Sequence, residues 1–118
     1  MNDTKIKIGN RGEQFVSDWL IKKGYKVLER NIRDKIGEID IIALHPNKQT
    51  ISFIEVRTRA NTQFGHPLET ISPHKQRKIR NAANLYLCKN GITNIAMQFD
   101  VASIVWSTNE FLYIENAF

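Results

Sequence analysis

Hydrophobic positions near the start of the chain follow the period of a helix. From about Gly9 to Lys23 the apolar residues recur every three to four positions, and Gly24 follows as a residue that commonly ends helices. The residues of this apolar stripe are Phe15, Val16, Trp19 and Leu20. The pattern predicts an amphipathic helix that packs one face against a core.

A second helical pattern begins near Ser72. We expect Ser72 to be its N-cap and Pro73 to occupy its first helical position. Its apolar residues follow the spacing i, i+3, i+4, i+7, i+8 and are Ile79, Ala82, Ala83, Tyr86 and Leu87. Asn90-Gly91 is expected to end the helix.

Five other segments have the composition of strands. They cover about residues 25–32, 37–44, 50–58, 95–106 and 111–115. The order is therefore helix, three strands, helix, two strands. This order predicts a mixed α/β domain, with a central sheet that has one helix on each face or both on one face. The 118 residues fit a single domain, 1–118.

Two of the predicted strands carry acidic residues among apolar ones. Segment 38–44 is apolar on both faces apart from Glu38 and Asp40, as in a central, buried strand. Alternation places Ile39, Ile41 and Ala43 on one face, and Asp40 with Ile42 on the other. The next strand places Ile51, Phe53, Glu55 and Arg57 on one face. Buried carboxylates are costly without a compensating group, so Asp40 and Glu55 need a partner.

The register of these two strands follows from the loop between them. If Asn47 and Lys48 form a two-residue hairpin loop, Asp40 lies directly opposite Glu55 with Cβ atoms roughly 5 Å apart. A divalent cation with oxygen ligands would relieve the repulsion between the two carboxylates. Alternatively, the acids form a buried salt-bridge network with Arg57 and Arg59 and perform no chemistry.

These residues resemble a known motif. Gly37-Glu-Ile-Asp followed by Phe53-Ile-Glu-Val-Arg is similar to the split acidic motif of the PD-(D/E)XK nucleases. Nearly the whole chain resembles the small bacterial UPF0102 (YraN-like) family. The remaining matches are Gly12-Glu13, Gly24-Tyr25, Asn31-Ile-Arg33, Arg59, Phe64-Gly65, Pro67, Lys75, Arg77, Ala82-Ala83, Tyr86-Leu87 and Phe99-Asp100-Val101. The resemblance implies a restriction-endonuclease-like (tRNA-endonuclease-like) fold, with a mixed central sheet flanked by helices.

The resemblance also implies a metal site. Asp40 and Glu55 match the metal-binding acids of these nucleases, and the Val56 carbonyl would be a further oxygen ligand. Glu13 matches the first-helix acid that completes the site in resolvase-like members. Its alternative is an ordinary first-turn acid favoured by the helix dipole. The expected cofactor is Mg or Mn.

Arg57 departs from the family pattern, because the last position of the motif is normally Lys. Arginine keeps its proton in proteins, so Arg57 can hold a phosphate or stabilise charge but cannot act as a general base. Lys75 lies one turn before Ile79 on the same stripe and is expected to face the sheet. We therefore treat Asp40, Glu55, Arg57 and Lys75 as the candidate catalytic residues.

The charge balance favours an anionic partner. The net charge is +5 and the pI is about 9.5, which is typical of proteins that bind DNA or RNA. The candidate phosphate contacts are Arg33, Arg59, Arg77, Lys78 and Arg80. The alternative for the helical residues of this set is a solvated surface. Asp100, in another apolar strand, is expected to pair with Arg57 or Arg59.

Three function hypotheses follow. The first is a metal-dependent nuclease acting on phosphodiesters of DNA or RNA, including structured or branched forms. The second is a catalytically inactive nucleic-acid-binding module with the same fold. The third, a protein-interaction domain with ion-paired acids, is disfavoured by the family resemblance. One cysteine, a polar start and no apolar span predict a cytoplasmic protein without a membrane segment.

Overall fold

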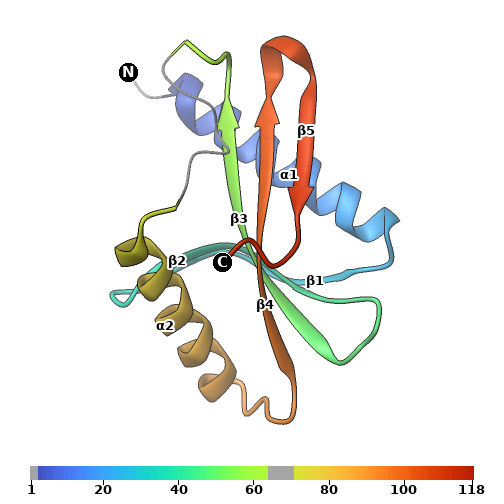
Figure 1. The fold of residues 1–118 in the computed structure, drawn as a ribbon, viewed down its shortest axis with the longest axis vertical. Helices are drawn as coiled ribbons and strands as arrows, with labels where there is room; N and C mark the ends of the chain where they lie inside the picture. The colour runs from blue at the N-terminus through green and yellow to red at the C-terminus, as the bar shows by residue number, and fades with distance from the viewer. Residues whose placement is uncertain (1–2, 64–70) are drawn as a thin grey trace.

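Five strands form one mixed sheet, and two helices cover its opposite faces (Figure 1). The computed structural model describes residues 3–63 and 71–118, and between 3 and 10 only the course of the backbone. The elements are α1 (Asp3–Lys22), β1 (Lys26–Arg33), β2 (Glu38–Leu44), β3 (Thr50–Arg59), α2 (Pro73–Lys89), β4 (Ala96–Val105), a 3-10 turn (Trp106–Thr108) and β5 (Glu110–Ile114). The strand order is β1-β2-β3-β4-β5; β3 and β4 are parallel, and the other neighbours are antiparallel.

The core has two layers, one on each face of the sheet. On one face α1 buries Val16 and Leu20 against the strands. On the other face α2 buries Ile79, Ala82 and Ala83. The predicted α/β class and the flanking helices are confirmed, and the arrangement is compatible with a restriction-endonuclease-like fold.

The ends of α2 are as predicted. The Ser72 side chain accepts a hydrogen bond from the Lys75 amide at 3.2 Å, Pro73 opens the helix, and Asn90 follows its last residue. By contrast, α1 begins at Asp3 rather than near Gly9. Its first turns lack an apolar stripe, and they extend a helix already fixed by the packing of Val16 and Leu20, which costs little once the helix is nucleated.

The predicted register of β2 and β3 is confirmed where the two strands pair. The paired residues run from Leu44↔Ile51 to Ile41↔Ile54. Asp40 and Glu55 lie one step beyond the last pair, at the point where the ladder between the two strands ends.

Near this point the side chains of β1 and β2 change the face of the sheet to which they point. The alternation pattern did not predict this change. Ile41 packs on the α1 face, whereas Ile39 packs on the α2 face, so the prediction that both share a face is wrong. Asn31 on the neighbouring strand has a φ of 54°, the left-handed region. We attribute the change of face to this residue, because it lies between the pairs Arg30↔Ile41 and Ile32↔Ile39.

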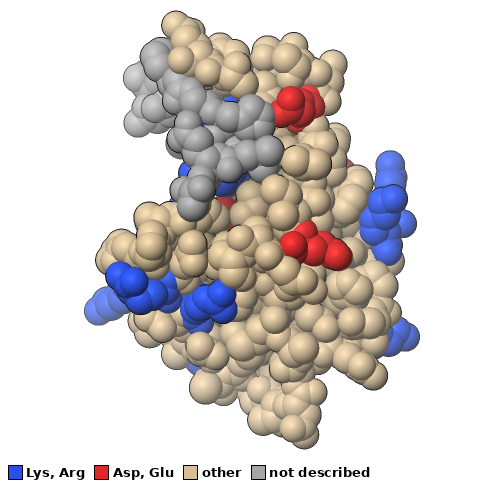
Figure 2. All heavy atoms as spheres, viewed as in Figure 1, with Lys and Arg blue, Asp and Glu red and all other residues tan. Residues whose placement is uncertain are grey.

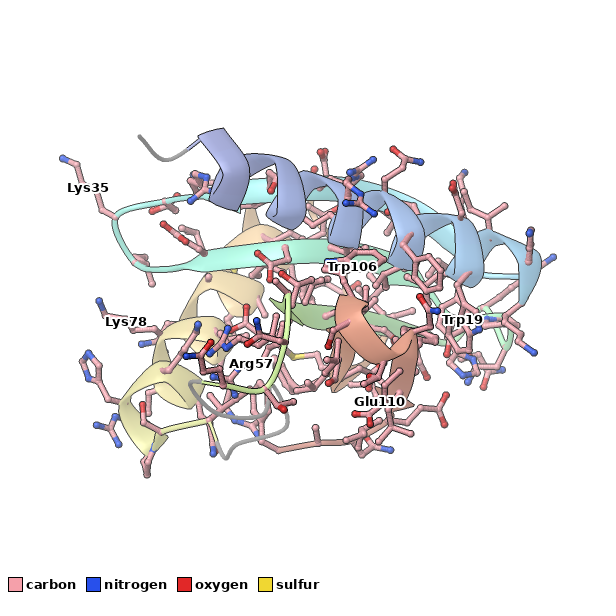
Figure 3. All side chains as sticks on the ribbon, turned by 90° about the horizontal axis from the view of Figure 1, so that it is seen from above. Trp19, Lys35, Arg57, Lys78, Trp106 and Glu110 are labelled. Atoms are coloured by element: carbon pink, nitrogen blue, oxygen red, sulfur yellow. The ribbon has the colours of Figure 1, made fainter. Side chains whose placement is uncertain are left out.

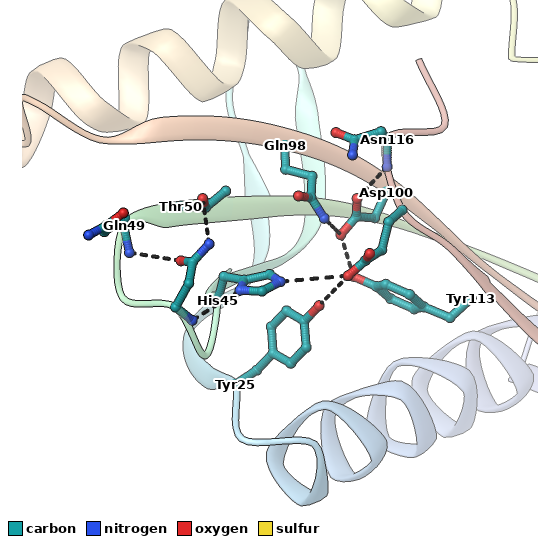
Figure 4. A network of polar contacts seen from close by, with 10 residues as sticks. Tyr25, His45, Gln49, Thr50, Gln98, Asp100, Tyr113 and Asn116 are labelled. Carbon is teal, nitrogen blue, oxygen red and sulfur yellow. Dashed lines mark hydrogen bonds and ion pairs between the residues drawn. The ribbon is translucent and has the colours of Figure 1, made fainter.

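A polar network joins the ends of β1, β4 and β5 (Figure 4). The fully buried Asp100 accepts hydrogen bonds from the Gln98 side chain at 3.2 Å, the Tyr113 hydroxyl and the Asn116 amide at 3.0 Å. The predicted pairing of Asp100 with Arg57 or Arg59 is therefore wrong. Asp100 shares the parity of Ala102 and Ile104, which face α1, whereas Arg57 points to the α2 face.

Some sequence predictions fall outside the described residues. Phe64-Gly65 and Pro67 are among them. In the parts of the chain that are described, no helix combines the length and apolar character needed to cross a bilayer.

Candidate active site

The Asp40 carboxylate lies at the split between β2 and β3. Its Oδ2 atom accepts a hydrogen bond from the Val56 amide at 2.8 Å. In an extended strand the N–H and C=O of one residue point to the same edge, so the Val56 carbonyl also faces the Asp40 side of β3. A carboxylate oxygen of Asp40 and the carbonyl oxygen of Val56 therefore both face the gap between β2 and β3.

Burial and a neighbouring acid both act on Asp40. Loss of solvent, a hydrogen bond with the Glu55 carboxyl group and the negative charge of Glu55 raise the pKa of Asp40 to about 8, against an opposing effect of the Val56 amide. The carboxyl group of Asp40 thus lies close to that of Glu55, in surroundings that favour the neutral form of Asp40.

Glu55 has a basic partner on α2. Lys75 Nζ lies 2.6 Å from Glu55 Oε2, and the Glu55 side chain is only 10% exposed while that of Lys75 is 53% exposed. Lys75 stands in the first turn of α2, where the Ser72 cap fixes the backbone. The prediction that Lys75 faces the sheet is confirmed. Among the residues that the structure describes, Arg59 forms no ion pair with Asp40 or Glu55, and its Nη1 donates to the Thr58 carbonyl at 3.0 Å.

Arg57 lies on the same face of β3 as Glu55. Val56 and Thr58 contact Gly12 of α1, so the alternate residues Glu55 and Arg57 point toward α2. Figure 3 shows Arg57 on this side of the sheet. The half-buried Arg57 thus adds positive charge on the α2 side, together with Lys75.

Glu13 approaches the acid pair from α1 but does not join it. Its side chain is 8% exposed, and burial raises its pKa against the opposing effects of a hydrogen bond with Asn31 and the charges of Arg30 and Arg33. Its charge also raises the pKa of Asp40. Among the side chains that the structure describes, those of residues 11–63 and 71–118, no three acidic, histidine or cysteine groups gather closely enough to hold a metal. The metal set of Glu13, Asp40 and Glu55 therefore stays a prediction, with Glu13 close enough for its charge to act on Asp40.

The remaining donors suit a hard divalent cation. Asp40 and Glu55 supply carboxylate oxygens, and the Val56 carbonyl is turned to the same gap, which is the ligand chemistry that Mg and Mn prefer. One Asp40 oxygen already accepts from the Val56 amide, so the other is the one available to a ligand. The residues present thus fit a cation bound by few protein groups and several waters.

The predicted phosphate contacts differ in their surroundings. Basic side chains gather over the first turns of α2 (Figure 2). Arg77 and Lys78 are exposed there. Arg80 instead lies over the Phe99 ring, 4.5 Å from its centroid, and Arg33 pairs with Glu38 at 3.1 Å.

Comparison with known sequences gives one consistent result. Residues 12–104 match the model of UPF0102, described as an uncharacterised protein family. A UPF0102 protein of Clostridioides difficile is 42% identical over 110 residues, covering 93% of this chain and 95% of its own length. One from Persephonella marina is 43% identical, with 93% and 91% covered. One from Caldicellulosiruptor saccharolyticus is 41% identical, with 97% and 98% covered.

Proposed function

The chain belongs to the uncharacterised protein family UPF0102, and we propose that this member is a metal-dependent nuclease centred on Asp40 and Glu55. The observation that carries the proposal is the convergence of these two acids at the split between β2 and β3, where Asp40 Oδ2 accepts from the Val56 amide at 2.8 Å and the 10% exposed Glu55 side chain acts on the pKa of Asp40. A site that only stabilised the fold would gain nothing from two acids so close together, because their burial and mutual repulsion oppose ionisation.

A bound cation accounts for this otherwise unfavourable arrangement. Asp40, Glu55 and the Val56 carbonyl would hold it, and Mg or Mn would supply a water of lowered pKa and charge stabilisation at the phosphate. Lys75 orients the Glu55 carboxylate through its 2.6 Å ion pair and keeps a half-exposed ammonium group facing the substrate side. Arg57 contributes a permanent positive charge on the same face, without releasing a proton.

A second candidate function is nucleic-acid binding without catalysis. Arginine at position 57, where the resembled nucleases have lysine, favours it. So does the absence, among the described residues, of a third acidic, histidine or cysteine side chain grouped with Asp40 and Glu55. Under this candidate the basic side chains along α2 bind phosphates and the acid pair has lost its role.

Cleavage of labelled nucleic acids distinguishes the two candidates. Linear, branched and single-stranded DNA and RNA are incubated with the protein in Mg, Mn or EDTA. Asp40→Asn and Glu55→Gln preserve shape and remove the charge of each acid in turn. Asp18→Asn is the matched control, since Asp18 is an exposed acid on α1 that bonds Gln14.

We expect the wild type and Asp18→Asn to cleave at least one substrate with Mg or Mn, and Asp40→Asn and Glu55→Gln to cleave none. Cleavage that persists in EDTA, or in both acid variants, would contradict the proposal. Salt-sensitive binding without cleavage of any substrate would instead support the binding module.

A further inference from the structure

A cleft leads from the surface to Glu55, one of the two acids of the candidate site. It has a volume of about 320 Å³ and is bordered by the β1–β2 turn, the first turns of α2 and the Glu55 side chain. That volume is at the lower end of the range for small-molecule sites. It suits one nucleotide at a time and is too small for two paired strands.

Two of the lysines around the cleft have no carboxylate partner among the described residues. Each carboxylate of its lining has a basic partner: Glu55 with Lys75, Asp34 with Lys89 and Glu38 with Arg33. Lys35 and Lys78 also border the cleft, and neither has a carboxylate partner among the residues that the structure describes. They come from the β1–β2 turn and from α2, and they extend to the same side of the molecule (Figure 3). Two uncompensated ammonium groups on opposite walls favour an anion between them.

The wall formed by the β1–β2 turn is rigid. The Asp34 amide donates to the Gly37 carbonyl at 3.0 Å, and the Gly37 amide donates back to the Asp34 carbonyl at 3.2 Å. Gly37 sits directly on α2, because a Cβ added there would lie 2.6 Å from the Lys78 carbonyl oxygen. The tip of this fixed turn presents Ile36, whose side chain is 40% exposed. This wall of the cleft is thus held in place, and Ile36 lies at its rim, next to Lys35 in the chain and outside the lining of the cleft itself.

We propose that this cleft binds one unpaired strand of nucleic acid, with Lys35 and Lys78 on its phosphates and Ile36 against a base. This inference rests on the proposed function and specifies its substrate as a single strand or an unpaired segment beside a duplex. An aliphatic side chain contacts the face of a base only where that base is unstacked. A continuous duplex would leave Ile36 without a partner.

Binding measured in EDTA tests the inference without requiring catalysis. Fluorescence anisotropy compares a labelled single strand with the blunt duplex of the same sequence. We expect tighter binding of the single strand by the wild type. Lys35→Gln with Lys78→Gln should reduce the log–log salt slope for the single strand by about 1.4, at about 0.7 per lost contact. Lys22→Gln with Lys26→Gln, at the last residue of α1 and the first residue of β1, is the charge-matched control and should leave the slope unchanged.

The role of Ile36 is tested by Ile36→Ser. This variant should lose about threefold in the ratio of single-strand to duplex affinity, as expected for removing part of an apolar contact. Ile21→Ser, at an isoleucine of α1 that is 58% exposed, is the control and should keep the wild-type ratio. Melting temperatures of both variants identify any general loss of structure.

The outcomes separate this inference from the nuclease proposal. If the duplex is bound as tightly as the single strand, or if the Lys22 and Lys26 control lowers the slope equally, the inference is wrong even where cleavage occurs. A protein that prefers the single strand through Lys35, Lys78 and Ile36 but never cleaves would support the inference and contradict the nuclease proposal.

Discussion

Asp40 supplies, from its side chain, a hydrogen-bond acceptor that the neighbouring strand no longer provides. The β2–β3 pairs end at Ile41↔Ile54, and the next free amide on that edge of β3, Val56, donates to Asp40 Oδ2. An asparagine could accept the same bond without a charge. The presence of an acid here, close to a second acid, therefore needs a reason beyond the satisfaction of one backbone amide.

The first prediction concerns the pH dependence of stability in EDTA. The folded-state pKa of Asp40, about 8, is above its ordinary value of 3.8. The folded protein therefore holds a proton that the unfolded chain releases, and the stability this provides, complete below about pH 4, is lost as the pH rises through 8. Asp40→Asn has no such loss. We expect its melting temperature to match that of the wild type near pH 5 and to be higher at pH 9. The difference at pH 9 should correspond to about 1–3 kcal/mol of unfolding free energy.

The same variant also reports on the cation. Mg or Mn at pH 8 should raise the melting temperature of the wild type, because a ligand that binds the folded state stabilises it. Asp40→Asn should gain little. A melting difference between the two proteins that does not change from pH 5 to pH 9, or equal stabilisation of both by Mn, would count against the acid pair as described.

The second prediction concerns Arg57. If its permanent charge stabilises the reaction, Arg57→Lys should keep or raise the cleavage rate, since lysine supplies the same charge. Arg57→Ala should lose about 2–4 kcal/mol of transition-state stabilisation, comparable to removing one oxyanion donor. Cleavage rates are measured beside melting temperatures. A large loss of melting temperature in Arg57→Ala, with cleavage absent from Arg57→Lys as well, would instead identify Arg57 as a structural ion-pair partner.

Among the elements, α1 and β3 approach each other closely at one glycine. A Cβ added at Gly12 would overlap the Thr58 Cγ2 atom. Alanine at a helical position usually stabilises by up to about 1 kcal/mol relative to glycine. Overpacking against a β-branched neighbour costs about 1–3 kcal/mol, so the clash should outweigh the helix propensity.

The third prediction is therefore that Gly12→Ala lowers the free energy of unfolding by about 1–2 kcal/mol, measured by urea denaturation. Thr58→Ser removes the Cγ2 methyl group, and the double variant Gly12→Ala with Thr58→Ser should recover most of that loss. Additive effects of the two substitutions would show that the helix and the strand do not meet through these atoms.

The sequence allowed the elements, the α2 cap and the β2–β3 register to be predicted, because each depends on neighbouring residues. The β2–β3 register is as predicted, although the loop spans residues 45–49 and its turn is closed by a bond from the Lys48 amide to the His45 carbonyl instead of across Asn47 and Lys48. Ser72-Pro73 fixes a helix start. The change of side-chain face near Asn31 could not be predicted in this way. A left-handed residue inside a strand changes the facing of everything beyond it, and period-two alternation assumes that no such residue exists.

The candidate site was predicted in part for the same reason. Asp40, Glu55 and Lys75 come together as expected from register and helix period. Their detailed partners depend on which side chains from distant segments reach them. Asp100 was expected to pair with arginine, but the packing of β5 and the residues after it brings Tyr113 and Asn116 to it instead.

Across the whole molecule, the net charge of +5 matters only where it is not neutralised locally. Arg33, Lys75 and Lys89 are each paired with a carboxylate. Arg80 is held over two aromatic rings, Phe99 and Phe118, at 4.5 and 5.6 Å from their centroids. The field available to an approaching polyanion therefore comes from fewer residues than the composition indicates.

The last prediction separates two arginines that lie one turn apart on α2. Arg77 is exposed and available to phosphates, whereas Arg80 is committed to Phe99 and Phe118. Arg77→Gln should lower the log–log salt slope of single-strand binding by about 0.7, the value for one lost phosphate contact, and leave stability within about 0.5 kcal/mol. Arg80→Gln should leave the slope unchanged and lower the free energy of unfolding by about 0.5–1 kcal/mol, as expected for an exposed cation–π contact. The measurements are salt titrations of binding and urea denaturation on both variants. Because both substitutions remove one charge from the same helix, equal slopes would mean that net charge alone governs binding and that the local partners of each arginine do not matter.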